Sequence, residues 1–153
     1  MNTFLKYLSV FGLSMLPIVE LRASVPWGVA QGLPLWAVLA VSIIGNMIPV
    51  PFIILFIRPL FSWMKKKSRW MARIVERIEN RAKNKHELIV RYQMLGLFIL
   101  VAIPLPGTGA WTGALVAALF DLRLKNAVPV ILIGVTVAGI VMSIISYGVS
   151  ALI

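Results

Sequence analysis

The sequence predicts an all-α integral membrane protein, and two observations lead to this prediction. Of the 153 residues, 60% are hydrophobic and 13% are charged, which leaves too little polar surface to coat a soluble globule of this size. The apolar residues also gather in long blocks, and a helix is the element that satisfies its own backbone hydrogen bonds inside lipid.

Four apolar blocks follow one another, at residues 4–19, 35–57, 92–120 and 128–153. The second and fourth, with 23 and 26 residues, exceed the roughly 20 residues that cross about 30 Å of hydrocarbon. The first stops at Glu20 and the third is broken at Pro104 and Pro106, so neither predicts a simple crossing. The first block lacks a small-residue cleavage pattern and is followed by Arg22, so we expect it to be retained rather than removed as a signal.

The net charge of +10 comes mostly from one segment, residues 62–91, which holds ten Lys and Arg against three Glu. A basic loop of this kind is expected on the cytoplasmic side. Apolar residues from Trp70 to Ile78 recur at helical spacing, and Arg69, Arg73, Arg77 and Arg81 form a stripe four residues apart. The pattern predicts an amphipathic helix on the anionic inner leaflet, as a plain connector or as a helix that binds lipid or a partner. It does not indicate nucleic acid as a partner.

The two flanking parts, residues 1–61 and 92–153, share one order of features within a single membrane domain: apolar run, break, short apolar run, connector and full span. An offset of 84 aligns Trp27 with Trp111, and an offset of 89 aligns Gly45 with Gly134. This order predicts an inverted repeat of a re-entrant hairpin plus a transmembrane helix, a known transporter plan.

Charge also bears on topology. With two re-entrant hairpins, the uncharged connector 31–34 lies outside, and the connector 121–127, with Arg123 and Lys125, lies inside. Four simple spans would place these two basic residues outside. We favour the hairpins, because non-helical backbone at membrane depth must be buried in protein or line a cavity. The two breaks are then expected to face each other near the midplane.

The first break contains opposite charges. Glu20 and Arg22 lie between Pro17 and Pro26, which we expect to interrupt the flanking helices. Glu20 is the candidate for proton coupling, and it is also able to be the structural counter-ion of Arg22. Arg22, Ser24 and Pro26 are the candidate substrate-binding residues of this break, because a guanidinium suits a phosphate or carboxylate.

The second break combines prolines, which stop a helix, with glycines, which permit a sharp turn. We expect Thr108 to cap the next half-helix, whose positive end would attract an anion. The candidate substrate-binding residues here are Pro104, Pro106, Gly107, Thr108, Gly109 and Trp111. Trp111 fits a pocket wall, and it also fits an interfacial anchor. In the second apolar block, Asn46 is expected to hydrogen-bond between helices, and Pro49 to help kink the span.

The motifs of both breaks resemble the small multidrug export proteins, a bacterial and archaeal membrane family, and the resemblance covers nearly the whole chain. More distantly, they are similar to the DedA superfamily, whose members are implicated in proton-dependent flipping of polyprenyl phosphate or phospholipids. The resemblance implies that Glu20 is the membrane carboxylate, Arg22 the anion-binding arginine and residues 104–109 the opposing tip. The chain departs from those relatives in being shorter and in having no arginine in its second hairpin.

These features together predict a multi-pass transporter in a bacterial or archaeal cell membrane. It would export or flip a small amphipathic, anionic substrate, a drug-like solute or a lipid phosphate, coupled to protons. The alternative is a non-transporting scaffold that uses its basic helix. We expect no enzyme, since no nucleophile and base pair is visible, and no metal or cofactor, since cysteine is absent and histidine occurs once. Expected partners are membrane lipids and the substrate, and so few spans are compatible with a homodimer.

Overall fold

A computed structural model of the chain describes residues 2–83, 86–105 and 108–150. Its helices are α1 (Thr3–Met15), α2 (Glu20–Ala30), α3 (Leu35–Met47), α4 (Pro49–Lys67), α5 (Arg69–Lys83), α6 (His86–Ala102), α7 (Ala110–Leu119) and α8 (Leu124–Ser150). Within these described ranges no residue is in a strand. The all-α prediction is therefore confirmed.

Two long apolar helical segments match the two predicted spans. The first joins α3 to the first part of α4 over Leu35–Leu60, and the second is Leu124–Gly148 within α8. Ile48 keeps a helical conformation between α3 and α4, and Pro49 opens α4, where its missing N–H costs little. The second span starts four residues before the predicted block because Leu124 already begins the helix, while residues 151–153 lie outside the described part.

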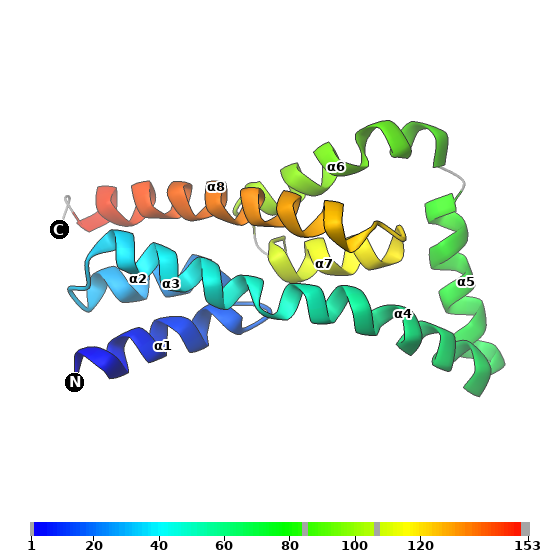
Figure 1. Cartoon of the computed structure of the whole chain (residues 1–153), viewed down its shortest axis with the longest axis horizontal. Helices are drawn as coiled ribbons and strands as arrows, with labels where there is room; N and C mark the ends of the chain where they lie inside the picture. Colours follow the sequence, from blue (N-terminus) through cyan, green and yellow to red (C-terminus); the bar gives the residue numbers. More distant parts are fainter. Residues whose placement is uncertain (1, 84–85, 106–107, 151–153) are drawn as a thin grey trace.

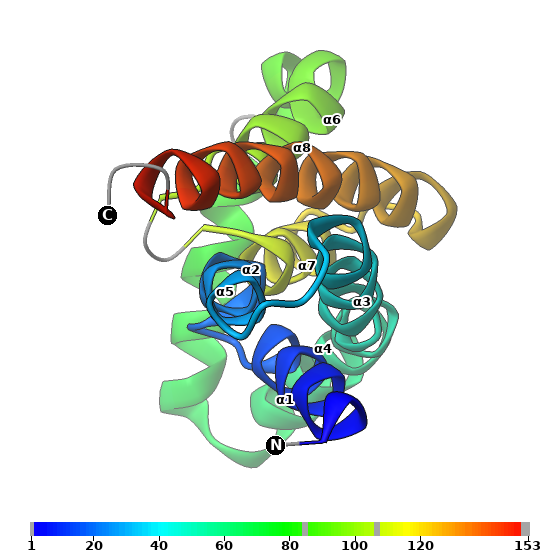
Figure 2. The same cartoon turned by 90° about the vertical axis from the view of Figure 1, so that its left-hand side faces the viewer.

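Two helical hairpins lie against these spans. Helices α1 and α2 form the first hairpin, which packs on α3, and α6 and α7 form the second, with α6 packed on α8. In Figure 1, α1 and α3 run from left to right, whereas α6 and α8 run from right to left. Figure 2, along the long axis, shows α2 and α7 in the centre, with α1, α3 and α8 around them.

The outer surface of the bundle is apolar, as expected next to lipid. A core of Val, Leu, Ile and Ala side chains fills the space between the helices, with Val38 and Ile131 fully buried. Large apolar side chains also point outward: Trp36 is 76% exposed and Ile144 is 68% exposed. Such a surface suits hydrocarbon better than water.

The basic segment is divided among three helices. Helix α4 continues to Lys67, Ser68 is extended, and α5 then runs across one end of the molecule (Figure 1). In α5, Val75 is buried while Arg69, Arg73 and Arg77 are exposed, which confirms the amphipathic helix. The predicted connector 62–91 thus covers the end of α4, the whole of α5 and the beginning of α6.

The connectors after α2 and α7 have matching backbone geometry at positions 89 apart. Gly32 and Asp121 both have positive φ, at 74° and 55°. The next residues, Leu33 and Leu122, each donate their N–H to the carbonyl five residues earlier, at 3.2 and 2.9 Å. Helices α3 and α8 also start 89 positions apart. Both connectors therefore turn the chain in the same way from a short helix into a long one.

Candidate functional site

The Glu20 carboxyl group lies at the start of α7. Glu20 is the first residue of α2, is 2% exposed and has φ of 48°, a conformation that costs free energy in a residue with a side chain. Its Oε1 accepts a hydrogen bond from the N–H of Trp111 at 3.2 Å, while its Oε2 is buried without a hydrogen-bond partner. The acid of the first break thus contacts the second break.

Gly109 provides the space for this carboxyl group. It has φ of 131°, and a Cβ built on it would lie 2.7 Å from Cδ of Glu20 and still closer to Oε2. The expected need for glycine at this turn is met at Gly109 for both backbone and steric reasons. Pro106 and Gly107, predicted for the same turn, lie outside the described residues.

Arg22 joins the two breaks a second time. Its Nη2 donates to Oγ1 of Thr108 at 2.7 Å, and this oxygen lies 2.8 Å from the carbonyl of Ile103 and 2.9 Å from that of Leu105. The prediction that Thr108 caps α7 is wrong: Gly109 is the N-cap, the Thr108 hydroxyl turns back to the preceding carbonyls, and the Trp111 N–H is bonded by Glu20 instead.

Glu20 and Arg22 do not form a direct ion pair, although both belong to the described chain. They are two positions apart on α2, and such residues point to different sides of a helix. Oε2 of Glu20 and Nε of Arg22 are both buried without hydrogen-bond partners. The carboxylate and the guanidinium therefore lie in the same site, but each bonds to a different group of the second break.

Asn46 is a further polar residue of the site. It is fully buried in α3, its carboxamide lies near the Glu20 carboxyl group, and neither amide atom has a partner in hydrogen-bond geometry. The expected interhelical contact is therefore made with Glu20 of α2, although neither amide atom reaches strict hydrogen-bond geometry. The sequence signal was an amide inside an apolar span, which showed that a partner was needed but not that it would be Glu20.

Ser24 and Pro26 lie further along α2. Ser24 is fully buried and donates its hydroxyl to Ser42 at 2.8 Å, so it joins α2 to α3. Pro26 lies inside α2, and the prediction that it interrupts the helix is wrong. It removes one backbone hydrogen bond, but packing of the buried neighbours Val25 and Gly28 maintains the helix.

Pro104 and Trp111 flank the second break. Pro104 is half-buried in the non-helical stretch after α6. Trp111 donates its indole N–H to the carbonyl of Met15 at 3.1 Å, which satisfies an end carbonyl of α1. Its ring also borders an apolar cleft of about 330 Å³ with Phe52 and Phe56 of α4. Trp111 thus belongs both to the second break and to an apolar groove beside α4.

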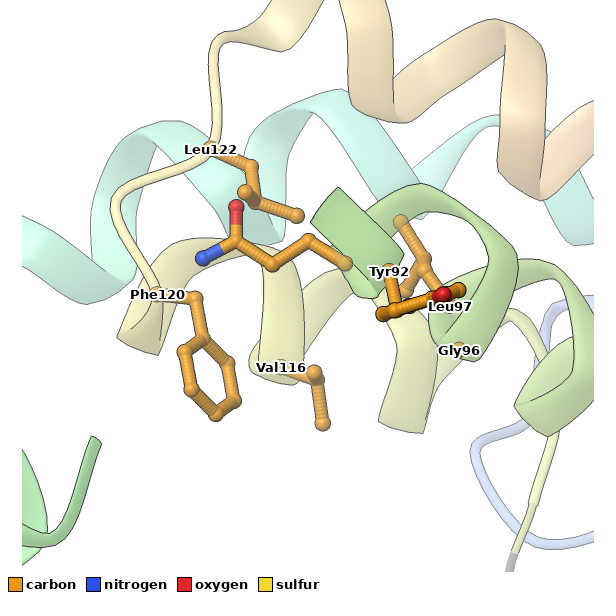
Figure 3. A pocket seen from close by; sticks show the side chains of 7 residues that line it. Tyr92, Gly96, Leu97, Val116, Phe120 and Leu122 are labelled. Carbon is orange, nitrogen blue, oxygen red and sulfur yellow. The ribbon is translucent and has the colours of Figure 1, made fainter. Parts of the chain in front are cut away.

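Another cavity, of about 270 Å³, lies between α6 and α7. Tyr92, Leu97, Val116 and Phe120 are among its lining side chains (Figure 3). No predicted site residue lines it.

Comparison with known proteins gives one match. Residues 20–141 match a family model described as "Putative small multi-drug export protein". No curated protein and no solved structure matches the chain. The matched range begins at Glu20, so it includes the charged residues of the first break and the whole second break.

Proposed function

Because this chain belongs to the small multidrug export protein family, we propose that it is a membrane transporter for a small amphipathic anion, coupled to protons. The observation that supports this most is the contact between the two breaks, where buried Glu20 meets the start of α7 and Arg22 meets Thr108. Buried ionisable groups at membrane depth usually serve a transport pathway.

The chemistry of the site favours an anion. The N–H of Trp111 lies at the positive end of α7, and Arg22 contributes a guanidinium held by a neutral hydroxyl rather than by a carboxylate. A phosphate or carboxylate would find both donor types here. We expect no catalytic step, since these groups bind and neutralise charge but include no nucleophile with its base.

The apolar cleft beside Trp111 suits the tail of such a substrate. It is lined by Phe52 and Phe56 of α4 and by Trp111, whose backbone N–H binds the Glu20 carboxylate at the start of α7. A drug-like solute or a lipid phosphate would place its charged group at the break and its tail in this cleft.

We further propose that the two halves form an inverted repeat with re-entrant hairpins, in a multi-pass protein of a bacterial or archaeal cell membrane. The matching connectors after α2 and α7, and the opposite directions of α3 and α8, support this arrangement (Figure 1). It is the plan that we expect from similarity to the DedA superfamily, and it gives access from both sides to one central site.

Transport in proteoliposomes with a pH gradient tests the proposal. A fluorescent short-chain phosphatidylglycerol serves as the lipid probe, and a fluorescent organic sulfonate as the drug-like probe. Glu20→Gln and Arg22→Ala should each abolish accumulation driven by the gradient. The matched controls are Glu76→Gln and Arg73→Ala, which remove the same charges from the exposed face of α5. Equal transport by the wild type and both site variants would refute the proposed mechanism.

A scaffold role is the second candidate, and the exposed Arg69, Arg73 and Arg77 on α5 favour it. It predicts that neither probe moves, while the protein binds anionic vesicles or a partner through these side chains. Replacing the three arginines with glutamine would then abolish binding, whereas Glu20→Gln would not affect it.

A further inference from the structure

We propose that the Glu20 carboxylate occupies the anion position at the start of α7 in place of a substrate, and that Asn46 receives this carboxyl group once it is protonated. The inference depends on the transport function proposed above and specifies its coupling. A substrate anion and a proton would bind together, and both would leave together.

The first step of the argument is that Glu20 uses the donors that an anion would use. Its Oε1 accepts the N–H of Trp111 at 3.2 Å, and the N–H of Ala110 also interacts with the carboxyl group. Its Oε2 lies against Gly109 at the helix start without a partner. Glu20 is 2% exposed, so no solvent compensates for that missing partner. A phosphate could bind these N–H groups only if the carboxylate moved away.

The second step is the charge of the pocket. Arg22 is the charged side chain that acts on Glu20, while α3 contributes the neutral Asn46 and α7 contributes backbone N–H groups. With the Glu20 carboxylate in place, the pocket contains one negative charge, on Glu20, and one positive charge, on Arg22. If a proton from the aqueous side bonds to Oε2, the acid becomes neutral and a monoanion restores the same balance. Binding the anion without a proton would leave a second buried negative charge, which is strongly unfavourable.

The third step is the position of Asn46. Both atoms of its carboxamide are fully buried without hydrogen-bond partners, next to the Glu20 carboxyl group. A carboxylic acid can donate its O–H to Oδ1 of the amide while its C=O accepts from Nδ2, whereas a carboxylate cannot supply the O–H. While Glu20 is ionised, only Nδ2 can interact with the carboxylate, and Oδ1 has no O–H to accept, in line with its lack of a partner. Asn46 is a positioning residue for the protonated state.

The consequence for transport is a fixed stoichiometry, with proton and anion moving in the same direction. One proton accompanies each negative charge of the substrate, and by thermodynamic linkage the anion increases the proton affinity of Glu20 as much as the proton increases the affinity for the anion. A more acidic solution on one side of the membrane would therefore drive the anion to the other side.

The test measures binding of two phosphodiesters by the protein in nanodiscs made from zwitterionic lipid. Dimethyl phosphate represents a free phosphate ester, and short-chain phosphatidylglycerol represents a lipid headgroup. Both keep one negative charge from acid to neutral pH, so any pH dependence comes from the protein. Wild-type affinity should fall by up to about tenfold per pH unit as the pH rises, as expected for one linked proton. Binding in weakly buffered solution should take up one proton. Preference for one probe identifies the source of the anion.

Variants separate the roles of the residues. Glu20→Gln should bind the anion with no pH dependence, because its side chain is always neutral, while Glu76→Gln should keep the wild-type profile. Asn46→Leu should weaken binding at acid pH by roughly fivefold or more, because the protonated acid then lacks its partner. Ser42→Ala, which removes another buried polar group from α3, should leave the pH profile unchanged.

The inference fails if wild-type affinity is the same at every pH, if no proton is taken up, or if folded Glu20→Gln does not bind. Proton uptake by the wild type decides the question even where a variant does not fold. Transport in proteoliposomes combined with pH-independent binding would refute this coupling and leave the transport function standing, whereas the absence of both binding and transport would refute both.

Discussion

Replacement of Gly109 by alanine tests the contact between the two breaks most directly. Gly109 has φ of 131° and ψ of −162°, a region almost restricted to glycine, where a side chain costs about 1–3 kcal/mol. The new Cβ would also lie against the Glu20 carboxylate and displace it from the N–H of Trp111. Losing a charged hydrogen bond costs about 1.5–3 kcal/mol, so we expect Gly109→Ala to destabilise the protein by roughly 2.5–6 kcal/mol.

Thermal unfolding of the purified protein in detergent measures this effect. For a chain of this length, 1 kcal/mol corresponds to about 2–4 °C, so the Tm should fall by roughly 5–24 °C. Gly12→Ala is the matched control, because a Cβ at Gly12 in α1 meets no atom within 4 Å. Alanine in a helix interior should raise stability there by about 0.5–1 kcal/mol.

A double variant separates the two contributions. In Glu20→Gly with Gly109→Ala, no carboxylate remains to be displaced, so the combined loss should be smaller than the sum of the single losses by roughly 1.5–3 kcal/mol. An unchanged Tm for Gly109→Ala, or strict additivity in the double variant, would refute the contact.

Three further predictions concern packing, the site and topology. Gly134→Ala should lower the Tm strongly, since its Cβ would lie 2.8 Å from that of Val101, and an unchanged Tm would contradict this packing. Thr108→Val should reduce transport at least several-fold while the protein remains folded, because the guanidinium loses its acceptor; unchanged transport would contradict this role. In this cysteine-free chain, Gln31→Cys and Asn126→Cys should react with an impermeant maleimide from opposite sides of the membrane, and labelling from one side alone would contradict the hairpin topology.

The parts of the fold that depend on local patterns could be predicted from the sequence. The long apolar runs gave the two spans, and the spacing of apolar and basic residues gave α5. Proline was less informative, since Pro26 remains inside α2 while Pro49 opens α4. Its effect depends on how the neighbouring side chains pack, which a local pattern does not show.

The sequence predicted which charged residues belong to the site, but not which groups they bond to. The sequence marked Glu20 and Arg22 as unusual and suggested that they face the second break, and the structure brings both to it. It did not show that they bind different groups, because this depends on the direction in which each side chain leaves α2. Nor could it assign Asn46 to Glu20, since the contact joins elements whose packing is set by the whole bundle.

The most informative relation in the molecule is between Glu20 and Gly109, which lie 89 positions apart, the same separation as the matched connectors. Both have positive φ at the beginning of a short helix, and they contact each other. An offset of 89 between the breaks, in place of the predicted 84 that pairs Trp27 with Trp111, makes them equivalent positions in the proposed repeat. Their tasks differ: one half supplies a charge, and the other supplies the space and the N–H groups that receive it. A symmetrical pair of acids would bury two negative charges together, and a pair of glycines would leave the helix starts without an anion. A single acid facing a single glycine gives one site that a carboxylate or a substrate can fill, but not both at once.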